Sequence, residues 1–101
     1  MIRVDISPIH GKGLFCCGSI TSEQEIAVTH FYSNKHKDWV NLTPNCMYNH
    51  SFEPNCESFT TLDDGVKIKI LRSLRDISHG EELLVDFSKD KDLEQPESSW
   101  K

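Results

Sequence analysis

The sequence predicts a single, mainly β domain with little helix. Short apolar runs alternate with polar residues, as in residues 2–6 and 66–70, which is the period of a half-buried strand. Asp63-Asp64-Gly65 separates two such runs, and Asp-Gly is typical of a tight β-hairpin turn. The helix-capping signals at residues 21–25 are followed by β-rich residues and not by a helix. Together these features favour an all-β or β-dominated domain.

The first third of the chain gives three predicted strands. Residues 2–6 alternate and end at a Ser-Pro step, residues 14–17 form a short buried apolar run, and residues 26–32 are β-rich. The turn Gly11-Lys12-Gly13 lies between the first two. Its glycines allow positive φ or the close approach of another group. It lacks the third glycine and the following helix of a dinucleotide site, so we reject that interpretation.

The middle of the chain is less regular. Residues 33–45 are polar apart from a short apolar contact that includes Trp39, and we expect at most one helical turn and a core role for this indole. Residues 48–56 combine two Asn, a His, a Ser and a Pro, which predicts a loop. Apolar residues lead into it and Phe52 lies within it, so the loop should be held against the core. Its polar groups should then face backbone or a polar ligand.

The last third begins with the predicted hairpin of residues 58–62 and 66–70. Residues 71–77 should continue its second strand, and residues 82–87 are strand-like. The patterns of residues 20–26 and 77–83 resemble each other, each with an apolar residue, a polar turn, a Glu and a strand. Residues 88–101 are polar and charged and are predicted to be a mobile tail, on which Trp100 either docks back or is exposed.

Composition limits the classes of function. The formal net charge is -5 and there is no basic block, so a phosphate-contacting nucleic-acid surface is not expected. No apolar run approaches the ~20 residues that span a bilayer, and the charged start does not fit a signal peptide. We therefore expect an intracellular protein, cytoplasmic or nuclear, without membrane association. Its four cysteines should be thiols. None of them form a C-x-x-C pair, so we predict no metal site; one would need long-range convergence with His10, His30 or His50.

Three stretches, in order, resemble the SET domain of S-adenosylmethionine-dependent protein-lysine methyltransferases. They are Gly11-Lys12-Gly13-Leu14-Phe15, Asn49-His50-Ser51-Phe52-Glu53-Pro54-Asn55-Cys56 and Gly80-Glu81-Glu82-Leu83-Leu84-Val85-Asp86-Phe87. The resemblance implies a SET-domain, β-clip-like fold of several small sheets, with a C-terminal pseudoknot. Residues 1–87 would form a minimal SET domain, of the kind known from viruses and bacteria, and residues 88–101 its tail.

The resemblance also implies roles for individual residues. Gly11, Lys12 and Gly13 would place backbone groups against S-adenosylmethionine. Asn49 would hold this cofactor through its side chain, and His50 largely through its backbone. The partner would be a lysine-bearing, basic protein or peptide, whose lysine enters a narrow channel, as a histone-lysine methyltransferase-like enzyme would require. A homodimer that completes the surface of so small a domain is a further hypothesis.

The main departure from the family pattern is Phe87, which occupies the position of the catalytic tyrosine. Loss of one preorganised polar contact to a transition state typically costs ~2.7–4 kcal/mol. Tyr32 and Tyr48 are the only tyrosines, and Tyr48 is better placed to supply a hydroxyl, although a core aromatic role is the alternative. Two functions therefore remain open, an active methyltransferase and a degenerate SET module that binds cofactor or peptide without efficient turnover.

Overall fold

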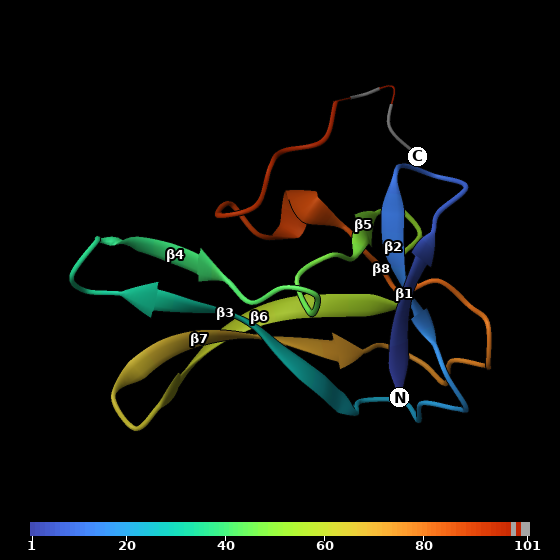
Figure 1. Cartoon of the computed structure of the whole chain (residues 1–101), viewed down its shortest axis with the longest axis horizontal. Helices are drawn as coiled ribbons and strands as arrows, with labels where there is room; N and C mark the ends of the chain where they lie inside the picture. Colours follow the sequence, from blue (N-terminus) through green and yellow to red (C-terminus); the bar gives the residue numbers. More distant parts are fainter. Residues whose placement is uncertain (98, 100–101) are drawn as a thin grey trace.

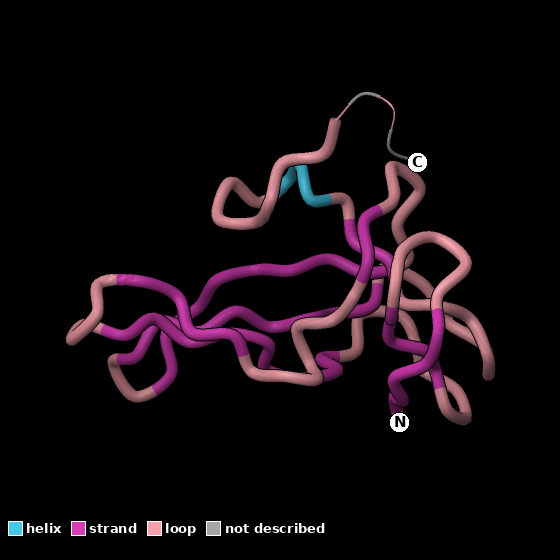
Figure 2. Tube along the Cα trace, turned by 45° about the horizontal axis from the view of Figure 1, so that its top comes forward, coloured by secondary structure: helices cyan, strands magenta, loops and turns pink. Residues whose placement is uncertain are grey.

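The computed structural model describes residues 1–97 and 99, and they form two β-sheets with one short 3-10 helix (Figures 1 and 2). A two-stranded sheet pairs β1 with β2, and a six-stranded sheet has the order β4-β3-β7-β6-β8-β5. The elements are β1 (Ile2–Ile6), β2 (Lys12–Cys16), β3 (Glu25–Ser33), β4 (Asp38–Asn41), β5 (Asn49–His50), β6 (Cys56–Asp63), β7 (Val66–Ser73), β8 (Leu84–Val85) and η1 (Phe87–Lys89). The predicted mainly β class is confirmed.

The predicted hairpin joins β6 to β7 in the expected register. Asp63 pairs with Val66, and the two turn residues Asp64 and Gly65 have φ of 52° and 79°. A two-residue hairpin turn of this kind needs a positive φ at both of its central residues, and a glycine adopts a positive φ without steric cost. This hairpin and the pair β3–β4 extend together as one arm of the molecule (Figure 1). Strand β7 ends at Ser73, so it is shorter than predicted.

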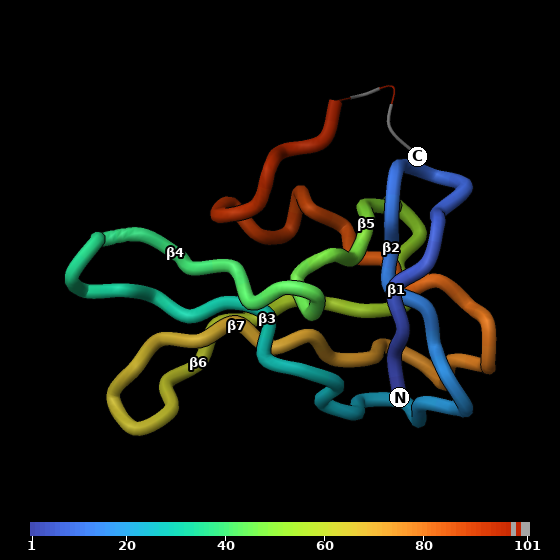
Figure 3. Tube along the Cα trace, viewed as in Figure 1, coloured from blue at the N-terminus to red at the C-terminus, as the bar shows by residue number. Residues whose placement is uncertain are grey.

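The two similar segments at residues 20–26 and 77–83 touch each other. Ile20 and Ile77 form an antiparallel bridge, with hydrogen bonds of 3.0 and 2.8 Å between their backbones. In Figure 3 the orange segment after β7 accordingly returns to the blue N-terminal hairpin. The main buried apolar cluster lies at this junction. Its members are Leu14, Cys16, Ile20, Tyr48, Cys56, Leu71, Ile77, Leu83 and Val85.

The short strand β8 lies between β5 and β6 and is parallel to both. Asn55, which is 3% exposed, fixes it from the side, because its Nδ2 donates to Glu82 O and its Oδ1 accepts from Leu84 N, both at 2.8 Å. Asn49 and His50 were expected in a loop, and that expectation is wrong. They form a strand because their pairing partners are Leu84 and Val85, which are remote in sequence.

Two further segments differ from expectation. Residues 38–41, predicted at most as a helical turn, pair with β3, and the Trp39 ring meets Tyr32 edge-on at 5.5 Å. Residues 88–95 were expected in a mobile tail, but they include the end of η1 and a turn in which Leu93 N donates to Asp90 O at 3.1 Å, and Leu93 packs against the core cluster. Trp100 lies outside the described residues. The described chain has no helix with the length and apolar character needed to cross a bilayer.

Candidate cofactor and acceptor site

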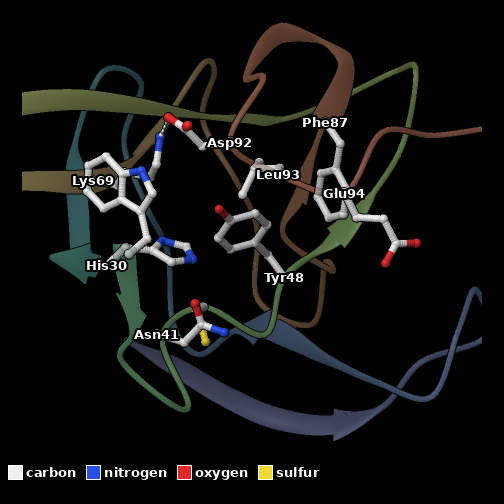
Figure 4. Close-up of a pocket in the computed structure, with 10 residues that line it drawn as sticks. His30, Asn41, Tyr48, Lys69, Phe87, Asp92, Leu93 and Glu94 are labelled. Atoms are coloured by element: carbon white, nitrogen blue, oxygen red, sulfur yellow. Dashed lines mark hydrogen bonds and ion pairs between the residues drawn. The ribbon is translucent and has the colours of Figure 1, made fainter. Parts of the chain in front are cut away.

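Two pockets lie on either side of Phe87. The larger, of about 680 Å³, is lined by Pro8, Ile9, His10, Asn49, His50, Phe87, Glu94 and Ser99. The smaller, of about 370 Å³, is lined by His30, Trp39, Asn41, Cys46, Tyr48, Lys69, Phe87, Asp92, Leu93 and Glu94 (Figure 4). Phe87 and Glu94 line both, so the two spaces adjoin at these side chains.

Asn49 connects β5 to the turn that precedes β2. Its Nδ2 donates to His10 O at 3.1 Å, to Lys12 O at 3.2 Å and to Glu82 Oε2 at 2.8 Å. The structure therefore brings Asn49 close to residues 10–12, at the end of the turn and the start of β2, as the sequence motifs predict. Because both amide hydrogens are engaged with the protein, the side-chain oxygen is the part of Asn49 left to accept a hydrogen bond from a ligand.

The predicted cofactor-binding residues divide into two groups. Asn49 and His50 line the larger pocket directly. Gly11, Lys12 and Gly13 do not line it, and the neighbouring residues Pro8, Ile9 and His10 form that wall. Gly11 has φ of 49°, which fits the expected backbone freedom. Gly11 thus belongs to the turn, whereas Lys12 and Gly13, expected in the same turn, begin β2 and pair with Ile6 and Asp5.

Glu82 organises this turn, and sequence reasoning assigned it no role. Its two carboxylate oxygens accept from Ser7 Oγ at 2.9 and 2.8 Å, and Oε2 also accepts from Asn49. A methyl group on Gly13 would overlap Glu82 Oε2 and come within 3.0 Å of Asn49 Nδ2. The group that approaches Gly13 closely is therefore this carboxylate. The sequence signal that could have indicated this role is that Glu82 is the second glutamate of the motif at residues 80–87.

His50 fixes the backbone of Phe87. The Phe87 N–H donates to His50 Nδ1 at 3.0 Å, so a neutral ring carries its proton on Nε2. The imidazole also packs edge-on against Phe52 and Phe87, with ring centroids 4.3 and 5.3 Å apart. The motif residue His50 consequently positions the phenylalanine that separates the two pockets.

Tyr48 lines only the smaller pocket. Its ring meets Phe87 edge-on at 5.9 Å, and Figure 4 shows its hydroxyl directed away from Phe87, toward the side where His30 and Lys69 lie. Among residues 1–97 and 99 the buried hydroxyl has no hydrogen-bond partner. Burial raises the pKa of Tyr48 to about 12, so the group remains a neutral phenol near pH 7.

The other end of the smaller pocket carries His30 and Lys69. Thr29 Oγ1 lies 2.7 Å from His30 Nδ1 and 3.3 Å from Lys69 O. Burial, and secondly the nearby Lys69 charge, lower the pKa of His30, which favours a neutral imidazole. Neither residue was predicted to belong to a site. Within residues 1–97 and 99, no group of three or more His, Cys, Asp or Glu side chains could hold a metal ion.

The fold and site define a small β domain in which a ligand-sized pocket adjoins a narrower one. A family model described as SET domain matches residues 21–88, and the chain belongs to the SET domain family. No curated protein sequence matches the chain.

Solved structures share this fold. The crystal structure of a candidate histone methyltransferase from Plasmodium falciparum has a TM-score of 0.72 and 20% identity, over 85% of this chain and 91% of that one. A humanized mutant of the Chaetomium thermophilum Polycomb Repressive Complex 2, bound to an inhibitor, gives 0.75 and 14% identity. That match covers 89% of this chain, which spans only 15% of the length of the other.

Proposed function

We propose that this domain is a protein-lysine N-methyltransferase that uses S-adenosylmethionine. The larger pocket would take the cofactor and the smaller one the lysine side chain. The observation that carries the proposal is that the two pockets adjoin at Phe87, with Asn49 and His50 of the SET motif in the wall of the larger one. In-line methyl transfer needs donor and acceptor held at near-attack distance from opposite sides, and two adjoining pockets provide that arrangement.

The larger pocket suits the cofactor in size and polarity. Its volume of about 680 Å³ falls within the usual range of small-molecule sites. Asn49 Nδ2 donates within the protein, so the side-chain oxygen is the atom that can accept a hydrogen bond from the cofactor ammonium. When bound, S-adenosylmethionine supplies a methyl group on a sulfonium, which a neutral amine takes by displacement.

The smaller pocket suits a lysine side chain. Tyr48, Phe87, Trp39 and Leu93 give it apolar and aromatic surfaces for the aliphatic stem. The rest of its lining is polar or charged, with His30, Asn41, Lys69, Asp92 and Glu94. Glu94 is exposed and has no ion pair among residues 1–97 and 99, and its negative charge favours a basic substrate segment.

A second candidate function follows from Phe87. Its side chain has no hydroxyl, and the Tyr48 hydroxyl is directed away from it (Figure 4). A module that binds cofactor and peptide but turns over slowly would have this arrangement. The methyl-transfer rate, and not the cofactor affinity, separates the two functions.

Cofactor binding tests the part that both functions share. Titration with S-adenosylmethionine, followed by calorimetry, should show saturable binding that Asn49→Ala weakens by at least about tenfold, the effect of removing ~1.4 kcal/mol. Asn34→Ala is the matched control, because Asn34 is exposed and outside both pockets. Absence of binding at millimolar cofactor would remove the main support for the proposal.

Phe87→Tyr tests turnover. Methyl transfer to a panel of lysine peptides should rise about 100- to 1,000-fold if the new hydroxyl reaches the reacting centre. Cofactor affinity should change little, since the ring and its backbone contact with His50 are kept. An unchanged rate with intact cofactor binding would show that position 87 does not face the reacting atoms. Product from the wild-type protein would establish the active enzyme over the binding module.

A further inference from the structure

Residues 87–95, here called the C-terminal segment, form a wall common to both pockets. Phe87 and Glu94 line both, and Asp92 and Leu93 line the smaller one. The segment is folded on itself, because Gln95 Nε2 donates to the carbonyls of Phe87, Asp90 and Leu93 at 3.2, 3.0 and 3.0 Å. Its placement on the body therefore decides the shape of both pockets.

Lys69 is the charged group of the body that holds this segment. It lies on β7, and its side chain is 1% exposed. Its Nζ donates to Asp90 Oδ2 at 2.7 Å and to Asp92 Oδ2 at 3.1 Å, both on the C-terminal segment, and to Thr60 Oγ1 at 3.3 Å. Three acceptors match the three hydrogens of an ammonium group.

The groups around Lys69 strengthen its ion pairs with Asp90 and Asp92. The Trp39 ring centroid lies 4.5 Å from Lys69 Nζ, which is within the range of a cation–π interaction. The Asp90 side chain is only 10% exposed, and its Oδ1 accepts from Asp92 N at 3.0 Å. The hydrogen bond from Lys69 is the first cause of the lowered pKa of Asp92, so this carboxylate stays ionised. Charges paired away from water are screened little and are costly to separate.

We propose that Lys69 is a positioning residue that latches the C-terminal segment and thereby couples the smaller pocket to the larger one. Lys69 itself lines only the smaller pocket. The coupling arises because Phe87 and Glu94 belong to the same latched segment and face both pockets. Loss of the latch should therefore weaken binding in a pocket that Lys69 does not touch. The identity of the ligands rests on the proposed function, and the latch does not.

The chain offers a matched control on the same strand. Lys67 lies two residues away, 4.9 Å from the Tyr32 ring centroid and 5.9 Å from that of Trp39. No ion pair joins Lys67 to a carboxylate among residues 1–97 and 99, and Lys67 is exposed. Lys67→Met therefore removes a lysine and a cation–π contact from β7 without removing an ion pair to the C-terminal segment.

Hydrogen exchange tests the latch directly. In Lys69→Met the amides of Asp90 and Leu93, which donate to Phe87 O and Asp90 O, should lose protection. The amides of the core strand β7 should stay protected, and Lys67→Met should match the wild type throughout. If the Asp90 and Leu93 amides are as well protected in Lys69→Met as in the wild type, the proposal is overturned. If that variant does not fold, Asp92→Asn gives the same test with a milder change, because Asp92 is the more exposed partner.

Cofactor titration tests the coupling. S-adenosylmethionine should bind Lys69→Met about tenfold more weakly, within the usual range for coupling between two sites, while Lys67→Met keeps its affinity. If Lys69 had only a structural role, Lys69→Met would lower the free energy of unfolding, but the folded variant would bind the cofactor as tightly as the wild type. Equal cofactor affinities of Lys69→Met and the wild type would therefore overturn the coupling. If the wild-type protein binds no cofactor, the proposed function fails, whereas the exchange experiment still decides the latch.

Discussion

Gly13→Ala is the sharpest test of how the start of β2 packs against Glu82 and Asn49. The added methyl would overlap Glu82 Oε2 and lie 3.0 Å from Asn49 Nδ2. Glu82 cannot retreat without leaving Ser7 Oγ, which lies 2.9 and 2.8 Å from its two oxygens. We therefore expect the carboxylate to move and the hydrogen bonds from Ser7 and Asn49 to weaken.

The expected cost combines two effects. Overpacking a filled site typically costs 1–3 kcal/mol, and a hydrogen bond to a charged group contributes about 1.5–3 kcal/mol. Because the carboxylate can shift and keep part of its contacts, we expect a net loss of ~2–4 kcal/mol in the free energy of unfolding. Affinity for the proposed cofactor should fall as well, since the added methyl would lie 3.0 Å from Asn49 Nδ2 and displace that side chain.

Urea denaturation measures this loss, and Gly11→Ala is the control. Both substitutions have the same effect on the unfolded chain. Gly11 has free space around it and a φ of 49°, so alanine there costs only the strain of a left-handed conformation, about 1–2 kcal/mol. In a Glu82→Ala background the cost of Gly13→Ala should fall, because the overlapping carboxylate is gone and only the 3.0 Å contact with Asn49 Nδ2 remains. A cost at Gly13 no larger than at Gly11, or one that is undiminished without the Glu82 carboxylate, would refute the reasoning.

Two further predictions concern the core of the site. Asn55→Ala should lower the free energy of unfolding by ~2–4 kcal/mol, because the partly buried Glu82 carbonyl and Leu84 amide would each lose a 2.8 Å hydrogen bond; Asn34→Ala should not. His30 has a folded pKa below its ordinary value of 6.5, so the unfolded state binds its proton first as pH falls. Its contribution to stability should be complete well above pH 6.5 and decline below it. Urea titrations at several pH values should show a steeper acid loss for the wild type than for His30→Gln.

Local chemistry explains which parts of the fold the sequence predicts. The β6–β7 hairpin was predictable because its turn, Asp64-Gly65, has the conformation that its own residues favour. Strand β5 was not, since Asn49 and His50 are extended only through pairing with β8, about 35 residues away. Strand β4 was missed for a similar reason, because polar residues surround Trp39 and its apolar neighbour and the pairing with β3 supplies the order.

The site, like the fold, has residues that the sequence predicts and residues whose roles depend on contacts remote in sequence. The motif residues Asn49 and His50 were predicted through the family resemblance, and they line the larger pocket. The alternation of residues 66–70 places Lys69 on the polar face of its strand, together with Lys67, and indicates nothing more. Alternation shows that two side chains share a face, but it does not show that the C-terminal segment covers one and leaves the other exposed. Glu82 likewise resembles any turn glutamate until the Ser7 and Asn49 donors are placed beside it.

Phe87 affects two properties that can vary independently, namely the wall between the two pockets and the rate of the proposed methyl transfer. The wall between the pockets depends on where its backbone and ring lie, which His50 sets through the 3.0 Å contact with the Phe87 N–H and which Lys69 supports through the C-terminal segment. In the proposed function, the rate of methyl transfer depends on a polar oxygen at the reacting centre, which the phenylalanine ring lacks. A change that restores the oxygen should therefore raise the rate without altering cofactor affinity. A change that moves the wall should lower affinity in both pockets together, and this opposite pattern is what distinguishes Phe87→Tyr from Lys69→Met.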